Sequence, residues 1–255
     1  EDSKSIFVRL PEKDVVTWST FIAGLVQHDC GEEALSHFEK MQQEGIEPNH
    51  VTFLCILRAC GSIGASSKGE EIHSQIIREK LLERNILLAT ALIDMYGKCR
   101  NIVDAYMVHL NGLQKQKYNV LSWSCLIAVY VNAGRMHEAL RQFYQMQLEG
   151  LQPNGVTFSS LLSGFRLNGS NSNLMVSESH GKITHVWANE IQVSSNDIVG
   201  SSLISMYGKF GNLKEAQKVF DEVLERSVVT WNALIEGYAQ YGQGDGAMNF
   251  RLSSL

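Results

Sequence analysis

The sequence predicts an all-α fold, a solenoid of helix-turn-helix repeats, on three observations. Similar residues recur as VVTWSTFIAGLVQ from Val15, VLSWSCLIAVYVN from Val120 and VVTWNALIEGYAQ from Val228. The chain around these copies divides into similar segments of about 35 residues, a period typical of solenoids. The best-formed segments each contain two apolar stripes of helical spacing. A single hairpin of this kind cannot bury its apolar face alone, so neighbouring hairpins must stack.

Segment 15–49 shows how the two helices of a repeat are specified. Its first stripe has the spacing i, i+3, i+4, i+7 and i+8 and consists of Trp18, Phe21, Ile22, Leu25 and Val26. Its second stripe consists of Ala34, Leu35, Phe38 and Met41. Residues 29–31 separate the stripes, and Gly45 with Pro48 ends the second one. We therefore expect one helix on each side of residues 29–31.

The rest of the chain divides in the same way. Residues 1–14 precede the predicted segments, which are 15–49, 50–85, 86–119, 120–154, 155–196, 197–227 and an incomplete one at 228–255. Segments 86–119 and 197–227 share ALIDMYGKC and SLISMYGKF. Segments 50–85 and 155–196 share GEEIH and GKITH, and the latter carries an insertion around FRLNGSNSNLMVSES. The order is therefore a cycle of three repeat types.

Composition excludes several classes of protein. A chain of 255 residues, 44% of them hydrophobic, can bury a substantial interior. It contains no apolar run of about 18 residues and no basic-then-apolar N-terminal pattern, so neither a membrane span nor a secretory signal is expected. Because the sequence begins at Glu1, we expect any targeting segment to lie upstream. Five cysteines without a CxxC pair argue against a zinc ribbon or a disulfide framework and indicate a reducing compartment.

The repeated residues resemble a known family. VVTWSTFIAGLVQ, EALSHFEKMQQEGIEPN and ALIDMYGKC are similar to plant pentatricopeptide repeat (PPR) proteins, and the alternation of repeat lengths resembles their PLS subfamily. The resemblance implies a right-handed superhelix in which 50–85 and 155–196 are long repeats, and 86–119 and 197–227 are short ones. Residues 1–14 resemble the tail of a preceding short repeat. Tetratricopeptide repeats would need a Trp-x2-Leu-Gly-x2-Tyr opening, which Trp18 does not begin.

The resemblance implies single-stranded RNA binding with about one base read per repeat. The second residues of adjacent repeats would sandwich each base. These residues are Val16, Val51, Leu87, Leu121, Val156, Ile198 and Val229. All seven are branched aliphatic residues, which suits a base sandwich. The residues by themselves leave open the alternative that they only pack the start of each first helix.

In the same scheme the fifth and last residues of each repeat contact the base edge. They pair as Ser19 with Asn49, Leu54 with Asn85, Thr90 with Asn119, Ser124 with Asn154, Ser159 with Asn196, and Ser201 with Ser227, and Asn232 is the fifth residue of the incomplete repeat. A hydroxyl plus an amide offers both a donor and an acceptor, and Ser or Thr with Asn resembles the family's adenine-preferring pair. The implied target is A-x-A-A-(A)-x-pyrimidine, 5′ to 3′. The structural alternative is that these residues are ordinary helix caps.

The charge distribution bears on this reading. A formal net charge of −5 argues mildly against a polyanionic partner. Basic residues outnumber acidic ones on the predicted first helices, with Arg58, Lys98, Arg166 and Lys209 against Asp94 and Glu236. Excess acid lies on the second helices, as in Glu32, Glu33, Glu39 and Glu44. We therefore expect a near-neutral to slightly positive lining that makes few phosphate contacts.

No group of residues predicts an enzyme. The deaminase-like domain that often follows PLS repeats needs His-x-Glu and Pro-Cys-x-x-Cys, and His37-Phe38-Glu39 matches only the first half. We expect a fragment or truncated member without that domain, no metal and no cofactor, with His37 at the surface. His73 and His185 recur at one place in the long repeats, which favours a packing or hydrogen-bonding role. Cysteines among apolar first-helix residues should be small buried hydrophobes, and these are Cys55, Cys60 and Cys125.

The sequence therefore predicts a sequence-preferring binder of single-stranded RNA in a mitochondrion or chloroplast. The resemblance implies a role in organellar RNA processing, such as recognition of C-to-U editing sites, with RNA-editing accessory proteins as further partners. No membrane contact and no small-molecule substrate are expected. A helical scaffold for protein partners remains an alternative, and so does a degenerate member without function.

Overall fold

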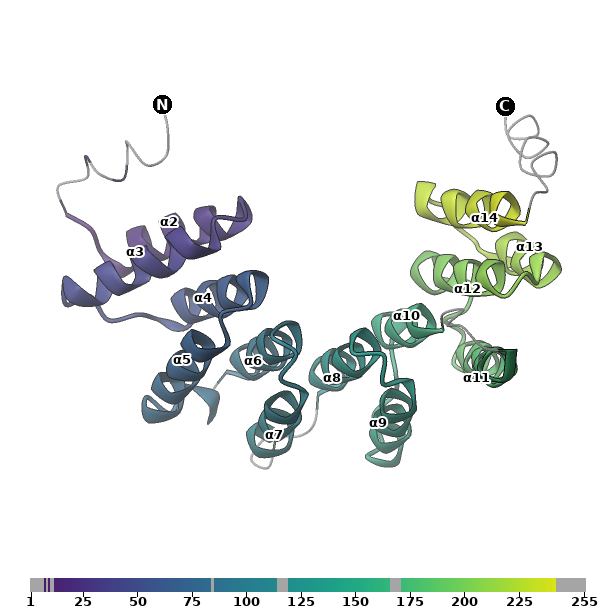
Figure 1. The fold of residues 1–255 in the computed structure, drawn as a ribbon, viewed down its shortest axis with the longest axis horizontal. Coiled ribbons are helices and arrows are strands. Elements are labelled where there is room, and N and C mark those ends of the chain that lie inside the picture. The colour runs from purple at the N-terminus through teal and green to yellow at the C-terminus, as the bar shows by residue number, and fades with distance from the viewer. Residues whose placement is uncertain are drawn as a thin grey trace. The chain divides into compact units, whose positions relative to one another are not determined.

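The computed structural model describes residues 7, 9, 12–83, 85–113, 119–165 and 171–241, apart from the side chains of 83, 112–113 and 171–177. The chain divides into two compact units, Glu1–Val129 (unit 1) and Tyr130–Leu255 (unit 2). Every regular element in the described ranges is helical, and no strand occurs among them (Figure 1). The predicted all-α class is confirmed.

Unit 1 is built from consecutive helical hairpins. Its helices are α2 (Val15–Gln27), α3 (Gly31–Gln43), α4 (His50–Ile63), α5 (Ser66–Arg78), the 3-10 helix η1 (Leu81–Glu83), α6 (Ile86–Lys98) and α7 (Ile102–Leu113). Helix α8 (Val120–Asn132) begins in this unit and continues into unit 2. Unit 2 then contains α9 (Met136–Leu148), α10 (Gly155–Gly164), α11 (Asn171–Glu190), α12 (Asp197–Lys209), α13 (Leu213–Glu222) and α14 (Val228–Gln240).

The first helix of each hairpin packs against the first helix of the next. Helix α4 contacts both α2 and α6 in unit 1, and α12 contacts both α10 and α14 in unit 2 (Figure 1). Each second helix lies against its own partner, and α3 and α5 also reach the next first helix. We call α2, α4, α6, α8, α10, α12 and α14 the first helices. Hairpins stacked in this way form a solenoid, as predicted.

A polar side chain begins each first helix. The side-chain oxygens that accept backbone N–H groups at these starts belong to Asp14, Asn49, Asn85, Asn119, Asn154, Asn196 and Ser227. Such a cap satisfies donors that a helix start leaves without a partner and is worth about 1 kcal/mol. Two second helices, α3 and α9, are followed by Gly45 and Gly150, both at φ 76°, a left-handed conformation that glycine adopts without strain. The residues predicted to end these helices therefore do so.

The apolar stripe predicted for α2 forms the core of its hairpin. Trp18, Phe21, Ile22 and Leu25 are all buried. His37, predicted to lie at the surface, is partly exposed and also contacts the core. Its ring is only partly exposed and lies 5.0 Å from the ring of Phe21, edge to face, while its Nδ1 is 2.8 Å from the carbonyl oxygen of Glu33. An aromatic neighbour and a main-chain partner thus draw this histidine onto the core.

The two histidines that recur in the long repeats each meet a tyrosine of the following first helix. His73 Nδ1 lies 2.9 Å from Tyr96 Oη, and His185 Nδ1 lies 2.9 Å from Tyr207 Oη. Burial lowers the pKa of both histidines and raises the pKa of both tyrosines to about 12, so the pairs are neutral at pH 7. The predicted hydrogen-bonding role is confirmed, and it joins α5 to α6 in unit 1 and α11 to α12 in unit 2.

Neighbouring first helices approach closely where one carries glycine. We expect Gly97→Ala in α6 to lower the free energy of unfolding by about 1–2 kcal/mol, because an added Cβ would lie 2.3 Å from Val129 Cγ2 of α8. Gly24→Ala in α2 is the matched control. Its Cβ meets nothing within 4 Å, and alanine should stabilise that helix by about 0.5–1 kcal/mol. Urea unfolding would contradict this explanation if both variants shifted stability in the same direction.

A buried histidine should make unit 1 sensitive to acid. His109 on α7 is buried with its ring 4.4 Å from that of Trp123, and burial lowers its pKa to about 4. The unfolded chain therefore takes up the proton first as the pH falls below about 6.5, and stability is lost between there and about 4. We expect this histidine to contribute a loss of about 2 kcal/mol between pH 8 and pH 5.

The control for this prediction is His109→Phe, which should reduce the pH dependence of urea unfolding by that amount. His73 and His185 also have lowered pKa values and lower the stability in acid in the same way, but the wild-type protein and His109→Phe both retain them. The difference between the two proteins therefore isolates His109. An unchanged pH dependence in His109→Phe would show that its protonation does not limit stability.

Candidate functional site

The second residue of every first helix exposes an aliphatic side chain. The exposed fractions run from 41% at Val51 to 64% at Val229. In unit 1 these residues are Val16, Val51, Leu87 and Leu121, and in unit 2 they are Val156, Ile198 and Val229. None of them is buried in the start of its helix. Within each unit, exposed branched aliphatic side chains at one register of successive helices form an apolar row that no described residue covers.

The fifth residue lies one turn further along each first helix. Spacings of i and i+3 place it on the same face as the second residue. Four of the fifth-position hydroxyls lie within hydrogen-bonding distance of a carbonyl of the helix's first turn, and these are Ser19, Thr90, Ser124 and Ser201. Ser19 can instead donate its one hydrogen to Thr52 Oγ1. Ser19, Ser124 and Ser201 are buried, Leu54, Thr90 and Ser159 are partly exposed, and Asn232 is exposed. The predicted contact residues thus differ widely in accessibility.

The last residue of each segment is the cap of the next first helix. The Oδ1 atoms of Asn85, Asn119 and Asn196 each accept from the N–H of a second-position residue. Ser227 Oγ accepts from Val229 N at 3.1 Å and, weakly, from Thr230 N at 3.4 Å. The cap role that the sequence left open is therefore present. A capping asparagine still carries an amide nitrogen, so this role does not use up its hydrogen-bonding capacity.

Asn49 and Asn154 are each held by a reciprocal capping box. Asn49 Oδ1 accepts from Val51 N and Thr52 N, and the Thr52 hydroxyl lies 3.2 Å from Asn49 N in a capping box. Thr157 completes the same box with Asn154. Reciprocal bonds of this kind fix the cap side chain as well as the helix start.

The structure brings one fifth and last pair together through a third residue. Ser19 Oγ and Thr52 Oγ1 are 2.7 Å apart, and Thr52 Oγ1 donates to Asn49 Oδ1 at 3.1 Å. Elsewhere the fifth residue meets the next first helix, as where Ser159 Oγ lies 2.9 Å from Ser202 Oγ. Within each unit, then, hydroxyl contacts tie the predicted contact positions to a neighbouring repeat.

A groove in unit 2 lies along the predicted positions of α12 and α14. Its volume is about 280 Å³, and it is lined by Ser201, Asn232 and Val229 together with Leu162, Ser163, Ser202, Ser205, Lys209, Ala233 and Glu236. Ser205 and Glu236 were not among the predicted contact residues. Both stand four residues after a fifth position, so helical periodicity alone places them on this face.

Charges along the first helices largely cancel. Lys98 Nζ lies 2.6 Å from Asp94 Oδ2, both about half exposed. Arg58 is exposed on α4, while Lys209 shares the unit 2 groove with Glu236. Arg166 lies outside the described residues. Helix α3 exposes four acidic residues, namely Glu32, Glu33, Glu39 and, at its end, Glu44. The surface of the first helices is therefore closer to neutral than that of this second helix.

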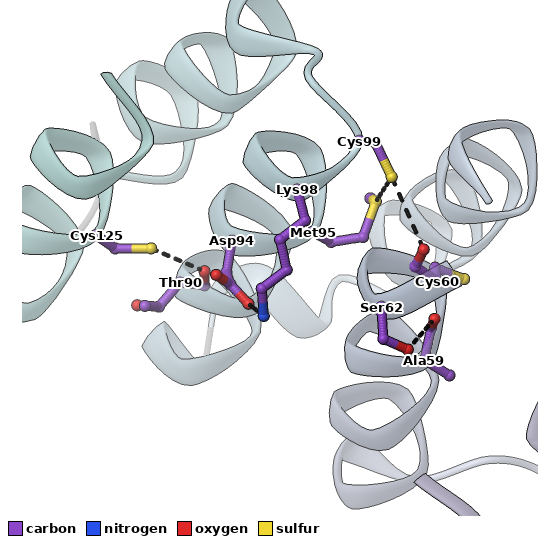
Figure 2. Close-up of polar contacts among 9 residues, drawn as sticks. All are labelled: Ala59, Cys60, Ser62, Thr90, Asp94, Met95, Lys98, Cys99 and Cys125. Atoms are coloured by element: carbon purple, nitrogen blue, oxygen red, sulfur yellow. Dashed lines mark hydrogen bonds and ion pairs between the residues drawn. The ribbon is translucent and has the colours of Figure 1, made fainter. Parts of the chain in front are cut away.

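Cysteine thiols occupy the contacts between first helices of unit 1. Cys125 Sγ donates to the Thr90 carbonyl at 3.7 Å, and Cys99 Sγ donates to the Cys60 carbonyl at 3.8 Å (Figure 2). Burial raises the pKa of Cys60 and Cys125 to about 12, so both stay protonated. Cys60 is buried as predicted, whereas Cys55 and Cys125 are partly exposed. These thiols pack helices and are poor nucleophiles.

Within the described ranges no three His, Cys, Asp or Glu side chains are grouped so that they could hold a metal ion. No helix there is both long and apolar enough to cross a membrane.

Comparisons with known proteins agree on one family. A model described as "PPR repeat family" matches residues 13–62 and 118–166, and one described as "PPR repeat" matches 201–228 and 229–251, together more than half of the chain. A chloroplastic pentatricopeptide repeat-containing protein of Arabidopsis thaliana is 36% identical, covering 94% of this chain and 37% of its own length. A mitochondrial one from the same plant is 32% identical, covering 97% of this chain and 34% of its own.

The chain thus spans little more than a third of these relatives. Among solved structures, the pentatricopeptide repeat protein PPR10 from maize matches with a TM-score of 0.52 at 19% identity, over 91% of this chain and 38% of that one. This similarity shows a common fold.

Proposed function

Because the chain belongs to the pentatricopeptide repeat family, as its sequence predicts, we propose that it binds single-stranded RNA and contacts about one base per repeat. The observation that carries the proposal is the exposed aliphatic row at the second positions. Base rings are flat and apolar on both faces, and covering an exposed aliphatic side chain with such a ring is favourable. Because each repeat contributes one side chain to this row, one base could lie between the side chains of each two successive repeats.

Base preference would come from the fifth and last residues. The proposed readers are Ser19 with Asn49, Thr90 with Asn119, Ser124 with Asn154, Ser159 with Asn196, Ser201 with Ser227, and Asn232. Their support is their register, since fifth residues share a helix face with the exposed row and last residues cap the adjoining helix start. Leu54 cannot hydrogen-bond a base. The expected target is A-x-A-A-(A)-x-pyrimidine.

The finer assignment is the PLS subfamily. Its support is the alternation of repeat types, in which the histidine of each long repeat bonds the tyrosine of the next short one, His73 with Tyr96 and His185 with Tyr207. We propose a binding protein, not an enzyme, that serves RNA processing in a mitochondrion or chloroplast, such as recognition of C-to-U editing sites with accessory proteins. Relatives named as chloroplastic and mitochondrial support an organelle without choosing between the two.

The direct test is fluorescence anisotropy with labelled oligonucleotides of equal length at fixed salt. The A-rich target sequence should bind more tightly than a C-rich one, because each net hydrogen bond contributes about 0.5–1.5 kcal/mol. Binding of a folded sample to neither oligonucleotide would reject the proposal. Capture of a protein partner without RNA, unaffected by changes at the first helices, would favour a scaffold instead.

The exposed row can be tested with matched variants in unit 1. We expect Val51→Ser and Leu87→Ser each to weaken RNA binding about fivefold, roughly 1 kcal/mol, because each removes apolar surface that a base would cover. Val103→Ser on the second helix α7 removes an aliphatic side chain that is 69% exposed, and it should leave affinity unchanged. Equal losses in all three variants would mean that the row is not the binding surface. Circular dichroism confirms that each variant is folded.

The Asp94–Lys98 ion pair predicts an unusual gain of affinity. We expect Asp94→Asn to strengthen RNA binding about two- to threefold at low salt, because it removes a negative charge and frees Lys98 to meet a phosphate. One added phosphate contact should steepen the slope of log K against log salt by about 0.7.

Glu178→Gln is the charge-matched control for this change. It releases Lys182 from a similar i,i+4 ion pair on the second helix α11. The net charge of the protein changes equally in both variants, so a purely long-range effect would appear in both. If the slope of log K against log salt also became steeper in Glu178→Gln, the added phosphate contact would not be specific to Lys98.

A further inference from the structure

One buried hydroxyl touches both proposed readers of the first repeat. Thr52 Oγ1 lies 2.7 Å from Ser19 Oγ, donates to Asn49 Oδ1 at 3.1 Å and accepts from Asn49 N at 3.2 Å. Thr52 itself is fully buried, so it cannot meet a ligand directly. Its position three residues after the cap is the one from which a side chain reaches back to the cap.

These bonds determine which end of the Asn49 amide remains available. A backbone N–H can only donate, so the atom facing Val51 N at 2.9 Å and Thr52 N at 3.0 Å must be the amide oxygen. The amide oxygen is therefore occupied by these hydrogen bonds, and the NH2 group is the end of the amide that points away from them. No acceptor within the described part of the chain takes the Nδ2 hydrogens of Asn49. The side chain therefore offers a ligand donors only.

The same arrangement occurs in unit 2. Thr157 is fully buried, its N and Oγ1 both donate to Asn154 Oδ1 at 3.0 Å, and Asn154 is exposed. Two of the other capping asparagines are less constrained. Asn85 and Asn196 each accept one bond, and the residues three positions after them are Leu88 and Val199, which have no hydroxyl.

We propose that Thr52 and Thr157 are positioning residues that hold Asn49 and Asn154 as fixed hydrogen-bond donors, so that these two asparagines recognise an acceptor atom on the base edge. The inference rests on the proposed function for its ligand, but the restraint on the amide exists without RNA. Base discrimination should accordingly be sharpest where the hydroxyl is present. The repeats that end at Asn49 and Asn154 are then the stringent ones, and those that end at Asn85 and Asn196 are permissive.

The test compares the RNA affinities of the wild-type protein, Thr52→Val and Thr52→Ser, each as the full chain. The RNA is changed only at the nucleotide assigned to segment 15–49. The wild-type protein should prefer adenine to cytosine there by about two- to twelvefold. Thr52→Val should bring that ratio close to one while leaving discrimination at the nucleotide of segment 86–119 unchanged. Thr52→Ser keeps the hydroxyl and should restore the preference. Thr184→Val removes an equally buried hydroxyl from the second helix α11, and it should change neither ratio.

A second measurement separates this inference from the proposed function. Nitrogen-15 relaxation of the Asn49 side-chain amide, without RNA, should report greater mobility in Thr52→Val and wild-type mobility in Thr52→Ser. Wild-type discrimination that survives in Thr52→Val overturns the inference and leaves the proposed function intact. If the wild-type protein binds no RNA, the function fails, and an amide equally ordered in Thr52→Val then overturns the positioning role as well.

Discussion

The cap hydrogen bond at the start of each first helix is the constraint on which the rest of the molecule depends. It decides which residue is first, and with 3.6 residues per turn it therefore decides where every other side chain of that helix points. The start at Val15 sends Trp18, Ile22 and Leu25 to the core and leaves Val16 exposed.

The same constraint would allow one residue to serve both folding and the proposed recognition. An asparagine has an acceptor at one end of its amide and two donors at the other, so capping engages one end and leaves the other for a ligand. Serine at the last position has one oxygen in place of an amide, and because Ser227 Oγ accepts at the start of α14, only its single hydroxyl hydrogen remains to donate. Ser227 would therefore offer a ligand fewer donors than a capping asparagine does.

Small, soft and polar groups contribute to the contacts between repeats. First helices meet through small or soft groups, such as Gly97 against Val129 and the Cys125 thiol on the Thr90 carbonyl (Figure 2). The His73–Tyr96 bond adds a directional link from a second helix to the next first helix. These groups are neutral at physiological pH, so the stack is held by packing and hydrogen bonds, while charge is confined to the surface. A protein with a net negative charge can therefore keep a nearly neutral surface along its first helices.

The sequence by itself determined the all-helical class, the hairpin repeat and the buried stripe of α2, because periodicity and helix-ending residues act over short stretches of chain. It also pointed to the hydrogen-bonding role of the recurring histidines. Only the tertiary structure decided that second-position aliphatic residues are uncovered, that His37 rests on Phe21, and that Thr52 joins Ser19 to Asn49. Each of these depends on the distance between residues that a stack brings together from neighbouring helices, and no local pattern in one repeat encodes that distance.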